Sequence, residues 1–209
     1  MWCCTRGRPK AAASTPSDAP PLAPGDIALS PRASEPLKRI EATREALFDA
    51  VEADDGALVE SLLAAGADAD EADGDGYTAL LLAAEEGAVS SCAALLAAGA
   101  DAAARDSYGR TALYAAAVSG KLNTVDALLA AGADPSARDS EGRSCLWAAC
   151  ATQHVDVAAA LLDGGAQIDA PDAKGTSPLQ HATASGFAEV IALLAARGAS
   201  DDDKGRLSM

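Results

Sequence analysis

The sequence repeats itself with a fixed period of 33 residues over most of its length. Four five-residue segments, each opening with a glycine, keep this spacing: 76–80, 109–113, 142–146 and 175–179. A second series of glycines keeps it too: Gly66, Gly99, Gly132, Gly165 and Gly198. A fixed period between about 20 and 50 residues is typical of stacked repeats, in which each unit buries its apolar face against its neighbours. The chain is therefore predicted to fold as a linear array of repeats.

Each repeat carries the same local signals in the same order. An aspartate opens a turn and a glycine follows three residues later, a pair that favours tight turns. A Thr or Ser then stands where a helix N-cap is expected, before a short Ala-rich helix. A second helix with paired leucines follows, and a left-handed glycine is expected to end each helix. The turn aspartates are Asp73, Asp106, Asp139 and Asp172; the caps are Thr78, Thr111, Ser144 and Ser177; the first-helix glycines are Gly87, Gly120 and Gly186.

This pattern resembles the ankyrin repeat, whose hallmark sequence is Thr-Pro-Leu-His-x-Ala. Only Pro178 keeps the proline, and the histidine position holds Leu81, Tyr114, Trp147 and Gln180. The resemblance implies an all-α repeat solenoid of helix-turn-helix units with β-hairpin-like turns. It also implies a protein-binding module, acting as an adaptor or scaffold, without chemistry of its own.

The repeat register divides the chain into three regions. Residues 1–35 are rich in Ala, Pro and Ser and are predicted to be a disordered tail. Residues 36–200 form the expected ankyrin-repeat domain, and residues 201–209 an acidic C-terminal tail. The domain comprises a degenerate first unit, 36–72, and four full units: 73–105, 106–138, 139–171 and 172–200.

Three local departures from the pattern are expected to matter. Glu45 replaces the capping hydroxyl of the first unit, and a helix is expected to begin near Pro36. Gln153 stands where the other units have a helix-ending glycine, so either a left-handed conformation there costs energy or the turn takes another shape. No polar capping unit follows the last repeat, so its second helix is expected to expose an apolar edge. That edge comprises Val190, Ile191 and Leu194. The following aspartates solubilise it, or another copy covers it; a monomer is favoured.

Charge and composition restrict the classes of partner. The chain has a net charge of −15, and residues 41–209 alone carry −18. Such a field repels nucleic acid and favours basic partners, although it also serves solubility. Only seven residues are aromatic, which suits a thin array of Ala and Leu. The five cysteines form no disulfide pattern, and no secretory signal is visible, so a cytoplasmic location is expected.

The extreme N-terminus leaves three interpretations open. Cys3 and Cys4 precede a small basic cluster, Arg6, Arg8 and Lys10. Two acyl chains on these cysteines, together with the cations, would anchor residues 1–10 to a membrane. An Ala/Ser-rich, basic segment without acid before Asp18 also fits an organelle transit peptide. The third interpretation is an unmodified tail.

The sequence offers little for catalysis or metal binding. Residues 71–77 look like the start of an EF-hand calcium loop, but the position that needs a bidentate Glu holds Leu82, so an inter-repeat turn is favoured. The histidines, His154 and His181, are interpreted as structural or solvated, with exposure expected for His154. No cysteine has a base at a recognisable spacing, and no phosphate-binding loop is present. No enzyme, cofactor or metal is therefore predicted.

What remains is a partner-binding surface on the turn tips and first helices. The resemblance places there sixteen candidates: Asp75, Tyr77, Glu85, Glu86, Arg105, Tyr108, Arg110, Tyr114, Val118, Ser119, Arg138, Glu141, Arg143, Trp147, Lys174 and Thr176. Tyr and Arg are the residue types that anchor interfaces. The groove is expected to be acidic at its N-terminal end and mixed Tyr/Arg at its centre. It predicts a partner protein with a basic segment and with acidic or aromatic character.

Two alternatives compete with this interpretation of the central residues. Tyr114 and Trp147 share one register position, so they are equally expected to stack as inter-repeat core. The arginines are alternatively expected to pair only with turn aspartates such as Asp106 and Asp139, in exposed contacts that contribute little.

Overall fold

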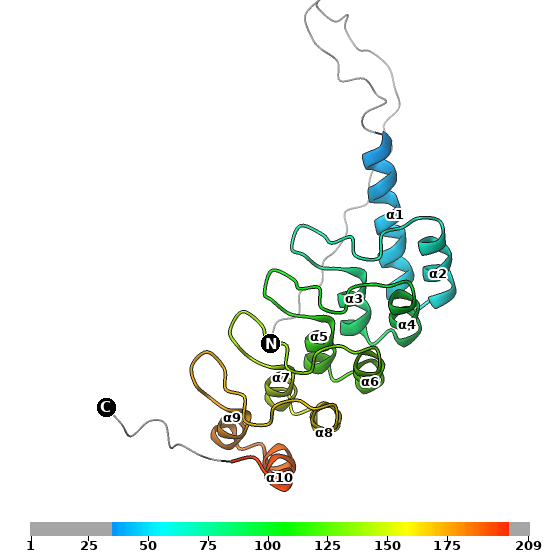
Figure 1. The fold of residues 1–209 in the computed structure, drawn as a ribbon. Coiled ribbons are helices and arrows are strands. Elements are labelled where there is room, and N and C mark those ends of the chain that lie inside the picture. The colour runs from blue at the N-terminus through cyan, green and yellow to red at the C-terminus, as the bar shows by residue number, and fades with distance from the viewer. Residues whose placement is uncertain (1–34, 201–209) are drawn as a thin grey trace, which may run out of the picture.

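The computed structural model describes residues 35–200, with side chains from residue 43 onward, and these residues form an array of paired helices (Figure 1). The helices are α1 (Glu35–Glu52), α2 (Gly56–Ala64), α3 (Ala79–Glu86), α4 (Val89–Ala97), α5 (Ala112–Ser119), α6 (Leu122–Ala130), α7 (Cys145–Ala151), α8 (Val155–Asp163), α9 (Pro178–Ser185) and α10 (Ala188–Ala196). The expectations for Cys3, Cys4 and the two terminal tails concern residues outside the described part.

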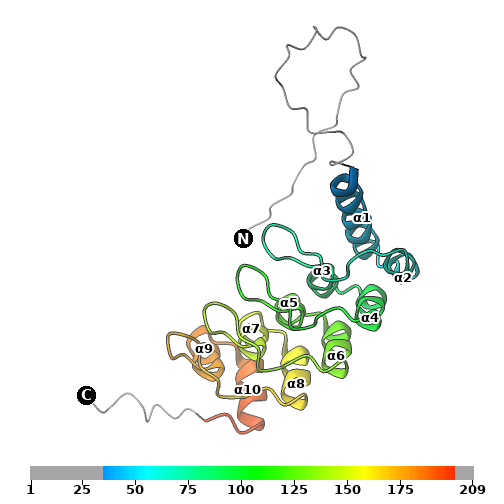
Figure 2. The same ribbon diagram turned by 45° about the horizontal axis from the view of Figure 1, so that its top comes forward.

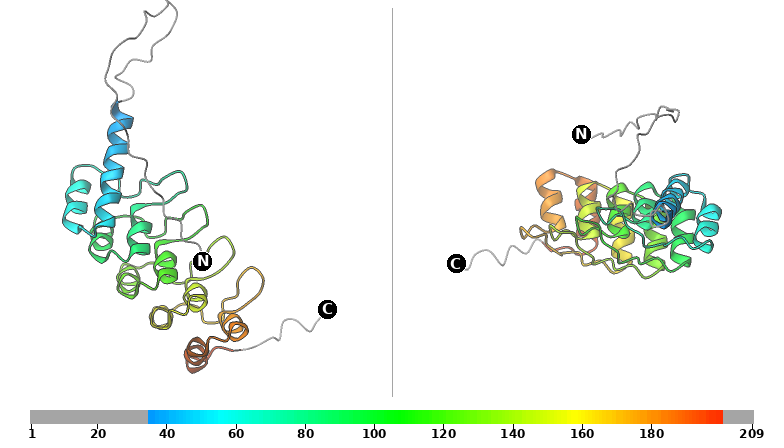
Figure 3. Two further views of the ribbon diagram at one scale, coloured as in Figure 1. Left: turned by 180° about the vertical axis from the view of Figure 1, so that it is seen from behind. Right: turned by 90° about the horizontal axis from the view of Figure 1, so that it is seen from above.

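The helices form two rows, and the turn loops project beside one of them (Figures 1 and 2). The first helices α1, α3, α5, α7 and α9 pack in sequence along the inner row, and α2, α4, α6, α8 and α10 along the outer row. The view from behind shows every loop on the same side of the array (Figure 3). The loops and first helices therefore share one continuous face, which positions the candidate surface.

The core runs through the array as repeated layers of Leu and Ala. Leu80, Leu113 and Leu146 are at most 1% exposed, and the second helices contribute Leu95, Leu128, Leu161 and Leu194 at 0%. One register position of the first helices is a fully buried alanine in every full repeat: Ala83, Ala116, Ala149 and Ala182. A methyl side chain lets these helices approach closely. Each unit thus buries its apolar face only when its neighbours are present.

The predicted caps are confirmed. The side chains of Thr78, Thr111, Ser144 and Ser177 each accept a hydrogen bond from the backbone N–H three residues on. Gly87, Gly120 and Gly186 take the left-handed conformation at the ends of α3, α5 and α9. Isolated β-bridges, Ala72 to Thr78 and Arg138 to Ser144, give two of the turns their hairpin-like character.

Two positions in the described chain take the left-handed conformation without a glycine. Gln153 has a φ of 63° after α7. Asp54 has a φ of 49° at the equivalent position of the first unit, where the sequence pattern did not predict it. The Asp54 carboxylate accepts a hydrogen bond from Ser91 N at 2.9 Å, which compensates part of the cost. Gln153 has no such side-chain contact among the described residues. We therefore regard Gln153 as a strained cap.

Substitution of Gln153 by glycine is expected to raise the free energy of unfolding by about 0.5–1 kcal/mol, because glycine adopts positive φ without a Cβ clash. The reverse change Gly186→Gln is the matched control, since Gly186 has a φ of 74° and a Cβ there would meet nothing within 4 Å. It should lower stability by a similar amount in urea unfolding. Equal stability of Gln153→Gly and the natural chain would show that the cap is not strained.

Two buried hydroxyls lie at equivalent positions in adjacent second helices. Ser91 and Thr124 are 0% exposed, and their hydroxyl oxygens have no hydrogen-bond partner among the residues that the structure describes. The next two repeats place Val157 and Val190 at this position. Thr124→Val keeps the shape and removes the unpaired polar group, so we expect stabilisation by about 1 kcal/mol. A lower urea midpoint for Thr124→Val would mean that the hydroxyl has a partner after all.

The start of the first helix agrees with the expectation, and the C-terminal edge of the array does not. Helix α1 runs unbroken through Glu45, because no turn aspartate or capping hydroxyl interrupts it, and it begins at Glu35. At the other end, the predicted apolar edge is wrong for Val190 and Leu194, which are 1% and 0% exposed. They belong to the buried core, and Ile191 is half-buried. The last unit instead exposes Thr183, where the earlier units bury Ala84, Ala117 and Cys150.

Candidate protein-binding surface

Each turn loop is built around its aspartate. The Oδ1 atom of Asp73, Asp106, Asp139 and Asp172 accepts two backbone hydrogen bonds, from the residues two and four positions later, at 2.8–2.9 Å. A left-handed glycine completes each turn, with φ between 72° and 80°. The resemblance of residues 71–77 to a calcium loop is explained by this turn, since the Asp73 carboxylate points at its own backbone. The loops therefore present their tips in one fixed conformation.

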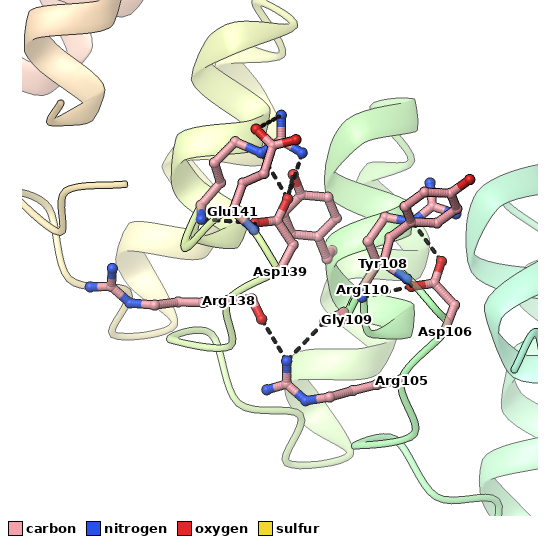
Figure 4. A network of polar contacts seen from close by, with 10 residues as sticks. Arg105, Asp106, Tyr108, Gly109, Arg110, Arg138, Asp139 and Glu141 are labelled. Carbon is pink, nitrogen blue, oxygen red and sulfur yellow. Dashed lines mark hydrogen bonds and ion pairs between the residues drawn. The ribbon is translucent and has the colours of Figure 1, made fainter. Parts of the chain in front are cut away.

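The two central aspartates also bind arginines, and these pairs are not the exposed contacts that were considered. Asp106 and Asp139 side chains are only 2% and 1% exposed. Nε of Arg110 donates to Asp106 Oδ2 at 2.6 Å (Figure 4). In the next repeat, Nε of Arg143 donates to Asp139 Oδ2 at 2.7 Å. The arginines remain about 30% exposed. Each guanidinium is thus held in place by a hydrogen bond to a buried carboxylate.

Tyr114 belongs to the inter-repeat core and not to the exposed surface. Its side chain is 4% exposed, and its hydroxyl donates a hydrogen bond to Asp139 Oδ2 at 2.9 Å. Burial and this hydrogen bond raise the pKa of Tyr114. Burial alone would raise the pKa of Asp139, but hydrogen bonds from Arg143 and Tyr114 outweigh it and hold that pKa below its usual value. The prediction that Tyr114 contacts a partner is therefore wrong, and Tyr114 has a structural role.

Arg105 and Arg138 connect neighbouring loops. Nη1 of Arg105 donates to Gly109 O at 2.8 Å and to Arg138 O at 2.5 Å (Figure 4). Arg138 makes the equivalent bonds to Gly142 O and Pro171 O. Backbone bonds join the tips as well, for example Ser140 N to Tyr108 O at 2.8 Å. The equal spacing of the two arginines was the sequence signal for these contacts, which we interpreted as partner contacts or as pairs with turn aspartates.

The remaining candidates differ in their exposure. Tyr108 is 63% exposed, and its ring lies 5.1 Å from the guanidinium carbon of Arg110. Asp75, Glu85, Glu86, Glu141 and Lys174 are also exposed, whereas Tyr77, Val118, Ser119 and Thr176 are half-buried. The Tyr77 hydroxyl donates a hydrogen bond to Glu85. Burial, followed by this bond to a carboxylate, raises the pKa of Tyr77.

Aromatic residues extend the surface toward its C-terminal end. Trp147 is half-buried and stacks on His181, with ring centroids 4.6 Å apart, and His181 in turn meets the edge of Phe187. The Arg143 guanidinium lies 5.6 Å from the Trp147 ring. The expected exposure of His154 is wrong: its ring is half-buried, and Nε2 lies 3.1 Å from Val118 O.

The described residues contain no group of three or more His, Cys, Asp or Glu side chains able to hold a metal ion. Cys92, Cys145 and Cys150 are buried. Burial raises the pKa of Cys92 to about 11 and the pKa of Cys145 and Cys150 to about 12. Since the thiolate is the reactive form, these side chains act as apolar filling. No helix of the described residues is long and apolar enough to cross a membrane.

Comparison with known families agrees with this architecture. The family model described as ankyrin repeats (3 copies) matches the chain twice, over residues 47–139 and 131–204. The chain belongs to the ankyrin-repeat family. Ankyrin repeats are generally protein–protein interaction modules and typically non-catalytic. A search of curated proteins found no match to the chain.

Proposed function

We propose that this ankyrin-repeat chain is an adaptor or scaffold that binds a partner protein on the face formed by its turn tips and first helices. The observation that carries the proposal is the loop ladder, by which we mean the hydrogen bonds from Arg105, Arg138 and the backbone that join successive turn loops. The backbone of successive loops is fixed by the buried aspartates, by the arginines that bond to the next loop, and by the backbone hydrogen bonds between loop tips. Tyr108 nevertheless stays 63% exposed at the centre of this surface. A preorganised surface with an exposed aromatic ring loses little conformational entropy on binding.

The ladder also determines which residues can be altered to test the proposal. Arg110 and Arg143 contact buried carboxylates, so a glutamate at either position would place two negative charges together and weaken the fold. Asp75, Glu86 and Tyr108 are exposed, and their side chains make no hydrogen bond among the described residues. They test binding without disturbing the ladder.

Affinity capture with quantitative mass spectrometry provides the test. A loop-face variant, Asp75→Lys/Glu86→Lys/Tyr108→Ser, is compared with the natural chain and with an outer-row control, Asp126→Lys/Asp156→Lys/Asn123→Ser. Both variants replace two carboxylates by lysines and one further exposed residue by serine, so their net charges are equal. Circular dichroism confirms that each stays folded.

We expect the loop-face variant to lose at least about 90% of its captured partner, because an exposed aromatic hot spot and two favourable charges contribute roughly 2 kcal/mol or more together. The outer-row control should retain the partner. Loss in the control with retention in the loop-face variant would place binding on the opposite face and contradict the proposal.

A further inference from the structure

The two arginines of the loop face differ in how much of each guanidinium is already bound. Nε and Nη2 of Arg143 lie 2.7 and 2.6 Å from Asp139 Oδ2, and Nη1 lies 3.4 Å from Glu141 Oε2. Arg110 donates from Nε to Asp106 Oδ2, but its Nη1 and Nη2 make no hydrogen bond to any side chain that the structure describes. Arg110 therefore keeps an unoccupied guanidinium edge.

The difference arises from one register position. Glu141 lies two residues before Arg143 and reaches the outer edge of its guanidinium. The equivalent residue before Arg110 is Tyr108, which has no carboxylate and whose exposed ring lies beside the guanidinium (Figure 4). The chain thus supplies the outer carboxylate itself in one repeat and lacks it in the repeat before.

We propose that Arg110 and Tyr108 form a subsite for the carboxylate of an Asp or Glu side chain on the partner protein. This inference rests on the proposed function and names one chemical feature of its partner. The carboxylate accepts hydrogen bonds from Nη1 and Nη2 of Arg110, and the partner chain beside it packs on the Tyr108 ring. Two terminal nitrogens in one plane match the two oxygens of a carboxylate.

The buried Asp106 makes this subsite ready to bind. Its carboxylate holds the guanidinium in place, so little side-chain entropy is lost when the partner binds. The surrounding field opposes an acidic partner as a whole, since the chain carries a net charge of −15 and Glu85 and Glu86 lie in the preceding repeat. The acidic residue is therefore expected to be a single feature of the partner, with neutral or basic neighbours.

Two substitutions of Tyr108 distinguish the contribution of its ring from that of the open guanidinium edge of Arg110. Tyr108→Glu removes the ring and supplies the outer carboxylate, as Glu141 does for Arg143. Tyr108→Gln removes the ring with the same side-chain shape but leaves the guanidinium edge open. The full chain and both variants, each immobilised, are presented with one displayed library of random peptides. The selected sequences are compared, and the affinities of the best peptides from the natural chain are measured.

The natural chain is expected to select peptides that share one Asp or Glu. Tyr108→Gln should keep this preference, and Tyr108→Glu should lose it and bind the acidic peptides about tenfold more weakly than Tyr108→Gln does. Peptides without a shared acidic residue, or an acidic preference that survives in Tyr108→Glu, would overturn the inference and leave the proposed function standing. If the natural chain selects no peptide at all, the proposed function fails and the inference fails with it.

Discussion

Replacement of Asp139 by alanine is expected to lower the free energy of unfolding by about 3–5 kcal/mol, the largest effect of any single substitution in the loops. The carboxylate is 1% exposed and is bound by two loop amides, by Arg143 and by the Tyr114 hydroxyl. Its removal leaves the buried Tyr114 hydroxyl and part of the Arg143 guanidinium without a hydrogen-bond acceptor. Urea unfolding monitored by circular dichroism measures the loss.

Asp172 provides the matched control for this prediction. It has the same register position, and its side chain accepts the same two loop amide bonds, from Lys174 N and Thr176 N. Thr176 stands where Arg143 stands in the preceding unit, so no guanidinium of the described residues binds Asp172. Asp172→Ala should therefore cost only about 1–2 kcal/mol. Equal losses for the two variants would contradict the claim that the buried Arg143–Asp139–Tyr114 contacts stabilise the loop beyond its turn.

The lowered pKa of Asp139 adds a pH dependence with a definite sign. A carboxyl whose pKa is lower in the folded than in the unfolded chain stabilises the fold above the unfolded pKa. That contribution is lost as the pH falls through the folded pKa, which lies below the usual value of about 4. The stability difference between the natural chain and Asp139→Asn should therefore narrow below about pH 4 and stay constant from pH 5 to 7. A difference that is independent of pH would contradict this account.

Substitution of Gly142 by alanine is expected to destabilise the chain by about 2–4 kcal/mol, for two separable reasons. Gly142 has a φ of 73°, which disfavours any Cβ, and an added Cβ would lie 2.9 Å from the backbone nitrogen of Ala173 in the next loop. Because backbone atoms of the adjacent tip cannot move aside independently, the clash should separate the two loops. The substitution thus directly disrupts the backbone contacts between adjacent loop tips.

Gly175 separates the two reasons. It occupies the same turn position with a φ of 80°, but a Cβ there would meet nothing within 4 Å, because the structure describes no loop packed beyond it. Gly175→Ala should cost only the conformational term, about 1–2 kcal/mol. Thermal unfolding of both variants gives the comparison. If Gly175→Ala costs as much as Gly142→Ala, close contact between the tips is not what stabilises them.

Much of this architecture follows from the 33-residue period. Capping hydroxyls, turn aspartates and left-handed glycines act within a few residues of their own position, so a single repeat suffices to predict them. The register marks Gln153 as the place where a glycine is missing, but it left open whether the cap keeps its left-handed conformation at a cost or the turn takes another shape. Local patterns therefore determine the helices, the turns and their order.

The properties that were not predicted depend on contacts between repeats. Burial of Asp106 and Asp139 arises because the neighbouring repeat covers them, and a turn aspartate alone suggests an exposed residue. The Tyr114 hydroxyl bonds to Asp139, which lies 25 positions later in the sequence, so no local pattern indicates that contact. The apolar edge at α10 was mispredicted because Val190 and Leu194 lie in the buried core, as their register equivalents Val157 and Leu161 do.

The central claim is that a partner protein binds to the loop face. Hydrogen–deuterium exchange of the full chain, with and without the partner recovered by affinity capture, tests it most directly. We predict that bound partner slows exchange in the loops around 106–111 and 139–144 and leaves the outer helices α4, α6 and α8 unchanged. Protection confined to those outer helices, with the loops exchanging at their free rates, would contradict the account.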